Sequence, residues 1–175
     1  MHYCIFNGYD SRDLGLMLES CPPRAAPKRR GEALTVPGRS GSLFIDEGAY
    51  ESYIRQAQFT LLDLSKLDQV CAAFQGSGWL TFDDEPNFKN FARVANQISF
   101  EQVALTLRKF PVEFECQPFK YERSPQELAY HLSQGYALET YLHNPGTVAA
   151  APLIKVSAGN SFVTVTAAGR SFKVR

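Results

Sequence analysis

The amino-acid sequence lacks long apolar runs and a net charge. No uninterrupted apolar run approaches the roughly 20 residues of a membrane-spanning helix, and the N-terminal segment has no basic stretch followed by an apolar one, the pattern of a cleaved secretory signal. We therefore expect a soluble chain with no membrane partner. The 18 basic residues balance 18 acidic residues, so no overall field attracts a polyanion, and nucleic acid is not an expected binding partner.

The sequence also lacks the motifs of a catalytic or metal site. No His-x-x-x-His pair occurs among its three histidines, which are His2, His131 and His143. The cysteines are too widely spaced for a structural zinc site, and ordinary reduced thiols are expected at Cys4, Cys21, Cys71 and Cys116. No nucleophile lies beside a base, and no loop fits a phosphate. We predict a protein that is not an enzyme and has no catalytic residue, cofactor or metal.

What the sequence has is the composition of a folded β-protein. Apolar residues make up 45% of its 175 residues, aromatic residues 13% and charged residues 21%, which suffices for a hydrophobic core without disulfides or metals. Apolar and polar residues alternate over residues 57–61, 112–116 and 163–166, a pattern typical of half-buried antiparallel strands. The predicted fold class is mainly β, with a barrel-like or two-sheet N-terminal domain.

One segment has helical periodicity instead. In residues 64–74 the apolar side chains recur at steps of three and four. Ser65 with Asp68 resembles a capping box at the start of this segment, and Gly76 can end a helix in a left-handed conformation. The pattern predicts one amphipathic helix of about three turns that lies over the sheet.

The composition changes near Asn144, from a segment rich in Phe, Tyr and charge to one rich in small and β-branched residues. We predict a boundary there between a domain of residues 1–143 and a partial domain of residues 144–175. Before the boundary, Ser124 could start a second short helix, although a strand or an extended linker fits equally well. After it, a meander of three strands is expected at residues 153–157, 161–166 and 171–174.

Two polar stretches are interpreted as turns. The stretch Asp83-Asp84-Glu85 follows a strand predicted at residues 79–82 and lacks the spacing of a calcium loop. The stretch Gly38-Arg39-Ser40-Gly41 lacks the lysine-serine ending of a P-loop and precedes a strand predicted from residue 42. With Pro37 at its first central position and Gly38 at its second, it fits a type II turn.

A basic stretch precedes the second turn and is interrupted by one acid, Glu32. An exposed basic loop of this kind can be solvated and idle, or it can contact an acidic neighbour in an assembly, and both readings stay open. Its members are Arg24, Lys28, Arg29, Arg30 and Arg39.

Several short motifs occur in an order typical of phage tail components. They are Phe6-Asn7-Gly8, Leu14-Gly15-Leu16, Val36-Pro37-Gly38-Arg39-Ser40-Gly41, Tyr50 and Asn144-Pro145-Gly146-Thr147. Through their order and spacing the sequence resembles the distal tail protein (Dit) family of siphoviruses and prophages over nearly the whole chain. In that family a PGR-x-G turn after a basic, ill-ordered loop marks the N-terminal domain, and here Val36, Pro37, Gly38, Arg39 and Gly41 match it.

The resemblance implies a structural role in a virion tail that is assembled in the bacterial host cytoplasm. Distal tail proteins of this kind form a hexameric ring whose N-terminal domains make a belt around a channel. The ring joins the tail tube protein to the tail-tip or baseplate proteins, and DNA only passes through the channel. The implied fold is a barrel-like belt domain with one helix, followed by the start of a galectin-like domain, for whose complete sandwich residues 144–175 are too few.

A ring subunit must present two different, complementary surfaces, and aromatic residues and arginine are common at the centres of such contacts. We predict subunit or partner contacts at Arg24, Lys28, Arg29, Arg30, Tyr50, Tyr53, Phe88, Phe91 and Tyr121. The alternative function is a β-sandwich module that binds carbohydrate or a host surface. The only tryptophan, Trp79, is expected to pack in the core, which disfavours a sugar platform.

Overall fold

The computed structural model describes residues 2–125, 127–131, 140, 141, 143–155, 163–167 and 170–174. Most of the regular structure in these residues is β-strand, which confirms the mainly β fold class. The chain divides into two compact units, Met1–Glu127 and Leu128–Arg175. The domain boundary predicted between residues 143 and 144 stays a prediction.

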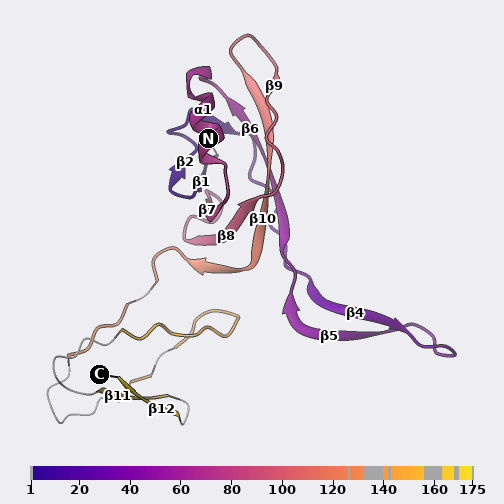
Figure 1. Ribbon diagram of the computed structural model, residues 1–175, viewed down its shortest axis with the longest axis vertical. Helices are drawn as coiled ribbons and strands as arrows, with labels where there is room; N and C mark the ends of the chain where they lie inside the picture. Colours follow the sequence, from indigo (N-terminus) through magenta and orange to yellow (C-terminus); the bar gives the residue numbers. More distant parts are fainter. Residues whose placement is uncertain are drawn as a thin grey trace. The chain divides into compact units, whose positions relative to one another are not determined.

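The first unit is built on an antiparallel sheet of eight strands in the order β2-β1-β7-β8-β10-β6-β3, with β9 paired to β10 (Figure 1). The strands are β1 (Cys4–Phe6), β2 (Tyr9–Asp10), β3 (Leu16–Leu18), β6 (Tyr53–Leu61), β7 (Ser77–Phe82), β8 (Phe88–Val94), β9 (Glu101–Gln102) and β10 (Arg108–Glu122). Although β1 and β3 lie toward opposite ends of this order, His2, just before β1, forms an antiparallel bridge with Leu18 of β3. The sheet therefore curls until its ends meet, as the barrel-like prediction expects.

The longest pairing in the sheet joins β6 and β10, and it follows the alternation seen in the sequence. Phe59 lies opposite Phe110, and Ala57 lies opposite Val112. All four side chains are fully buried, whereas Gln58, between two of them along β6, is not. Because successive side chains of a strand point to opposite faces, this register turns one complete apolar face toward the core.

The predicted helix is present as a 3-10 turn, η1 (Leu64–Lys66), that leads into α1 (Leu67–Ala73). Its cap differs from the prediction, because the residue that caps η1 is Asp63 and no Ser65–Asp68 box forms. The Asp63 carboxylate accepts a hydrogen bond from the Ser65 backbone N–H at 3.0 Å. Beyond the helix Gly76 has φ 71°, as the predicted left-handed ending requires.

Phe74, which ends the helix, lies at the centre of an aromatic core. Its ring is 4% exposed. It contacts four phenylalanine rings of the sheet at centroid distances of 5.3 to 6.3 Å, those of Phe6, Phe59, Phe110 and Phe114. The helix is thus held to the sheet mainly by this one side chain, together with the buried Val70 and Ala73.

Strands β4 (Arg29–Thr35) and β5 (Ser42–Tyr50) form a separate two-stranded sheet, here called the hairpin. The strand predicted from residue 42 is confirmed. The basic stretch was not expected to be a strand, but Arg29 and Arg30 belong to β4, opposite Tyr50 and Ala49. Apart from Gly31 and the last two residues of β5, every residue of the two strands is exposed.

In the second unit, β11 (Val163–Ala167) pairs antiparallel with β12 (Arg170–Val174), which confirms two strands of the predicted meander. In the strand predicted at residues 153–157, residues 153–155 have no strand structure, and residues 156 and 157 lie outside the described residues. The described residues between Ser124 and His131 form no helix, and the rest of that candidate is likewise outside the description. In the part of the chain that the structure describes, no helix has the length and apolar character needed to cross a membrane.

Candidate assembly surfaces

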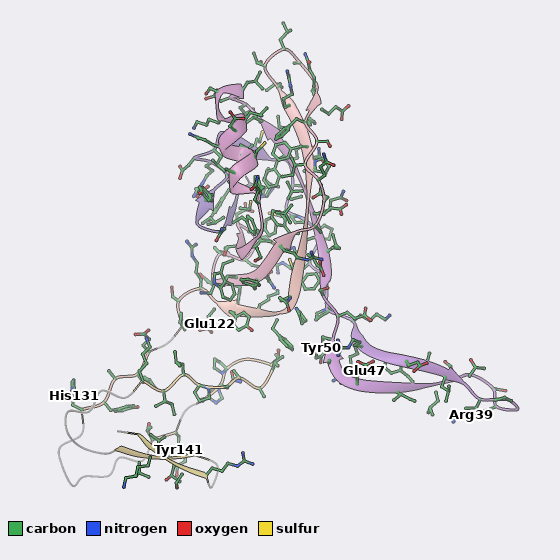
Figure 2. The ribbon with its side chains drawn as sticks, in the orientation of Figure 1. Arg39, Glu47, Tyr50, Glu122, His131 and Tyr141 are labelled. Atoms are coloured by element: carbon green, nitrogen blue, oxygen red, sulfur yellow. The ribbon has the colours of Figure 1, made fainter. Side chains whose placement is uncertain are left out.

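The tip of the hairpin is the turn that carries the family motif. The Arg39 backbone N–H donates a hydrogen bond to the Val36 carbonyl at 3.2 Å, which closes the turn. Gly38 has φ 82°, a left-handed conformation, and Pro37 precedes it, so the predicted type II turn is confirmed. Gly41, at the start of β5, also has φ 82°. Figure 2 places Arg39 at the end of the hairpin and Tyr50 where the hairpin joins β6.

Three exposed apolar side chains share one face of the hairpin, on which Glu32 also lies. Leu34 lies opposite Leu43 in the register, and Ile45 lies two residues further along β5, so the three side chains share one face. Their exposed fractions are between 42% and 51%. A two-stranded hairpin alone is marginally stable in water, and an exposed apolar face costs free energy unless another surface covers it. The hairpin therefore has the character of a contact surface.

The basic stretch is neutralised by acidic residues of the same chain. Arg29 Nη1 lies 2.7 Å from Asp46 Oδ2, and Arg30 Nε lies 2.6 Å from Glu47 Oε2, in both cases across the hairpin. The Asp46 carboxylate accepts a backbone hydrogen bond from Gly48 as well as the bond from Arg29, and these bonds lower its pKa. The positive charges are thus not gathered for a polyanion, which agrees with the sequence analysis.

The first two members of the basic stretch, Arg24 and Lys28, are also paired. Lys28 Nζ lies 3.9 Å from Glu51 Oε1 at the base of the hairpin. Arg24 Nε lies 3.0 Å from Asp84 Oδ2 in the turn after β7. The basic partner of every pair is exposed, although Asp84 is partly buried, so each pair adds little to stability, but together they fix where the basic side chains point.

Of the predicted contact residues, Tyr50 ties the hairpin to the sheet, and Tyr53 makes a contact within the sheet. The Tyr50 ring contacts the Phe119 ring edge to face at 5.7 Å, and the Arg29 guanidinium lies 5.1 Å from the Tyr50 ring centre. The Tyr53 hydroxyl accepts a hydrogen bond from Asn90 Nδ2 at 3.2 Å. Burial raises the pKa of Tyr53, which is partly buried. Both tyrosines therefore have a role within the subunit, and their contact with a partner stays a prediction.

A second exposed surface, here called the aromatic face, lies on β7, β8 and β10. The Trp79 ring contacts the Phe91 ring and the Tyr121 ring, each edge to face at 5.4 Å, and Lys89 Nζ lies 4.7 Å from the Trp79 ring centre. Phe88, at the start of β8, is also exposed, but the alternation of the strand puts it on the other face from Lys89 and Phe91. Three of the predicted contact residues, Phe88, Phe91 and Tyr121, are thus brought onto neighbouring strands.

The expectation that Trp79 packs in the core is wrong. Its side chain is 42% exposed, whereas its neighbours Gly78 and Leu80 are buried. The reason is the period of the strand, because residues next to each other in β7 point to opposite faces. Leu80 and Phe82 occupy the core face, so Trp79 is placed on the outer one.

The acidic stretch after β7 is a turn, as predicted, and each of its carboxylates has a basic partner. Asp84 pairs with Arg24, and Glu85 Oε1 lies 2.5 Å from Lys120 Nζ. Asp83 Oδ2 lies 2.8 Å from His2 Nδ1.

This last contact belongs to a cluster that the sequence analysis did not find. Cys21 Sγ donates a hydrogen bond to Asp83 Oδ1 at 2.6 Å and lies 3.6 Å from His2 Nδ1. Burial, and next the bond to Asp83, raise the pKa of the Cys21 thiol to about 11. The three residues come from three separate segments, so no local spacing indicates them, and only the closure of the sheet brings them together.

Comparison with known proteins shows which known fold this chain resembles. No family model and no curated protein matches the chain. Among solved structures, its curled antiparallel sheet is similar to that of a phage tail component, so the fold is Dit-like.

The similar structure is the Dit protein (gp 19.1) of phage SPP1, described as a paradigm of the hub adsorption apparatus in phages that infect Gram-positive bacteria. The TM-score is 0.58 and the sequence identity is 15% over 70% of this chain and 52% of that chain. The chain thus spans about half the length of that protein. At this identity the similarity establishes the fold.

Proposed function

We propose that this chain is a non-catalytic, structural subunit of the tail hub of a siphovirus or prophage. The observation that carries the proposal is a Dit-like sheet with an exposed apolar hairpin that ends in the PGR-x-G turn. The similar protein of SPP1 is described as a hub, and the order of motifs in the sequence supports the same role independently.

In this proposal the hairpin contacts the next copy of the chain around a hexameric ring. A ring closes through head-to-tail contacts, in which one surface of a subunit meets a different surface of its neighbour. The Leu34, Leu43 and Ile45 face is one candidate surface, and the aromatic face is a candidate for the other or for a tail partner. Arg29 and Arg30 are already paired with Asp46 and Glu47, so the contact gains chiefly from buried apolar area.

The ring would connect the tail tube protein to the tail-tip or baseplate proteins, and DNA would only pass through its channel. The protein would be part of the virion tail after assembly in the host cytoplasm. Its work in this role is to hold a shape and to make contacts, and it requires no cofactor.

The proposal is tested by native mass spectrometry and by electron microscopy. The wild-type chain is expected to form a ring with an open centre, and the double variant Leu43→Glu, Ile45→Glu is expected to be monomeric, because two charges would have to be buried in each contact. The matched control, Gln97→Glu with Gln102→Glu, adds the same charge at exposed positions away from the hairpin and is expected to keep the ring. Native mass spectra with only wild-type monomer at high concentration would refute the proposal.

One observation bears on the alternative, a module that binds carbohydrate. An exposed tryptophan is a common sugar platform, and Trp79 is exposed. Its ring, however, has Lys89 over it and two aromatic rings against it, which leaves less of it for a sugar to stack on. Glycan-array binding by the wild-type chain that is lost in Trp79→Ala, with the fold intact, would favour this alternative.

A further inference from the structure

His2, Cys21 and Asp83 bring three different metal-ligating groups together. The imidazole nitrogen, the sulfur and a carboxylate oxygen all lie within 4.8 Å of one another. Cys21 and Asp83 are partly buried, and His2 is exposed. The cluster thus has a protected side formed by the protein and a side open to solvent.

The backbone holds two of these residues in place. His2 is fixed by its bridge to Leu18 at the closure of the sheet. The Asp83 backbone N–H donates to the Tyr3 carbonyl at 3.1 Å, which ties the turn after β7 to the N-terminal strand. Ligands that are fixed before binding lose little conformational entropy when a metal arrives.

We propose that His2, Cys21 and Asp83 form a binding site for a zinc ion, with a water molecule as the fourth ligand on the open side. A set of one nitrogen, one sulfur and one carboxylate oxygen suits this borderline-soft ion, and three protein ligands with one open position are a common zinc arrangement. The proposal does not depend on the assembly role.

The distances fit this ion with a small movement. With usual zinc–ligand lengths, a tetrahedral site separates sulfur from nitrogen by about 3.6 Å and each of them from a carboxylate oxygen by about 3.3 to 3.5 Å. Cys21 Sγ and His2 Nδ1 are 3.6 Å apart. Asp83 lies nearer, with Oδ1 at 2.6 Å from the sulfur and Oδ2 at 2.8 Å from the nitrogen, so its carboxylate must turn and withdraw by about 1 Å for one oxygen to bind the ion. The ion takes the place of the thiol proton, which leaves to solvent as the thiolate binds.

Such an ion would link His2, at the point where the sheet closes, to Asp83 in the turn after β7. It would therefore stabilise the fold of the first unit, as structural zinc ions do in other proteins. The gain is expected as a rise in melting temperature, of the order of 5 °C when free zinc far exceeds its dissociation constant.

The experiment uses the full chain without a histidine tag, freed of metal by a chelator. Titration with zinc is followed by calorimetry and thermal unfolding, and titration with cobalt(II) is followed by absorption. One equivalent of zinc is expected to bind and to raise the melting temperature. Cobalt is expected to give a thiolate charge-transfer band together with the intense visible bands of a four-coordinate site.

Two cysteine variants separate the site from a general thiol effect. Cys21→Ser should lose the charge-transfer band and weaken zinc binding at least about tenfold, a loss that is common when one zinc ligand is altered. Cys71→Ser, which changes a partly buried cysteine of α1, should behave as the wild type. His2→Ala, which changes an exposed side chain and spares the thiol, should weaken binding without loss of the fold. The proposal is overturned if the wild type binds less than one equivalent, or if Cys21→Ser and Cys71→Ser bind zinc equally well.

Discussion

Phe74→Ala should destabilise the protein more than any single change on its surface. The ring is 4% exposed and contacts four other phenylalanine rings. Removing a buried Phe side chain costs about 3–5 kcal/mol, because the transfer free energy and the cavity add, and the loss of four aromatic contacts places this ring in the upper part of that range. We expect a loss of about 4–5 kcal/mol in the free energy of unfolding. That is a large part of the roughly 5–15 kcal/mol by which native proteins are stable.

The matched control is Phe91→Ala, which removes the same atoms from the aromatic face. Phe91 is 39% exposed and has one ring contact, so a loss near or below about 1.5 kcal/mol is expected. Unfolding in urea should be followed by far-ultraviolet circular dichroism, because Trp79 touches Phe91 and its fluorescence would change in the control. If Phe74→Ala does not fold, Phe74→Leu should give a smaller loss of the same sign. Equal losses for Phe74→Ala and Phe91→Ala would refute the description of the core.

Two further predictions concern the hairpin and the first turn of the chain. In Gly31→Ala the new Cβ would lie 2.3 Å from the Ile45 carbonyl oxygen, so the hairpin should lose about 1–3 kcal/mol of stability. Hydrogen exchange should become faster in β4 and β5 and stay unchanged in β6 and β10. Unchanged exchange rates in β4 would contradict this. Hydrogen bonds from Arg12 lower the pKa of Asp10. The bonded carboxylate therefore stabilises the fold above the ordinary carboxyl pKa, and this stabilisation is lost as the pH falls through the lowered value. Arg12→Ala should return the pKa of Asp10 toward the ordinary range, as carbon NMR titration can measure, and a titration curve like that of the wild type would count against the reasoning.

The sheet was predictable where one face of a strand is buried. The alternation around Phe59 and Val112 marks β6 and β10 correctly, because their polar residues face out. The turn at Gly38 was also predictable, since few residues other than glycine adopt a positive φ. By contrast, β4 is exposed on both faces and begins with two arginines, so no apolar period distinguishes it from a loop.

The candidate surfaces were only partly predictable. The sequence indicates which aromatic residues could form contacts, and Phe91 and Tyr121 do lie on one face, whereas Phe88 does not share it. It does not show that Trp79 joins them, because a tryptophan in a strand beside apolar neighbours is compatible with either face. The cluster of His2 and Cys21 with Asp83 was not predictable, because their proximity arises from the closure of the sheet and not from any local pattern.

The position of β10 in the sheet affects when the first unit can fold during synthesis. It pairs with β6, β8 and β9, and it is the last strand of the first unit to leave the ribosome. Until β10 has emerged, β6 and β8 have no strand between them, so one edge of each lacks its pairing partner. Formation of this unit should consequently be late and abrupt, and a nascent chain stalled before Arg108 should stay sensitive to protease.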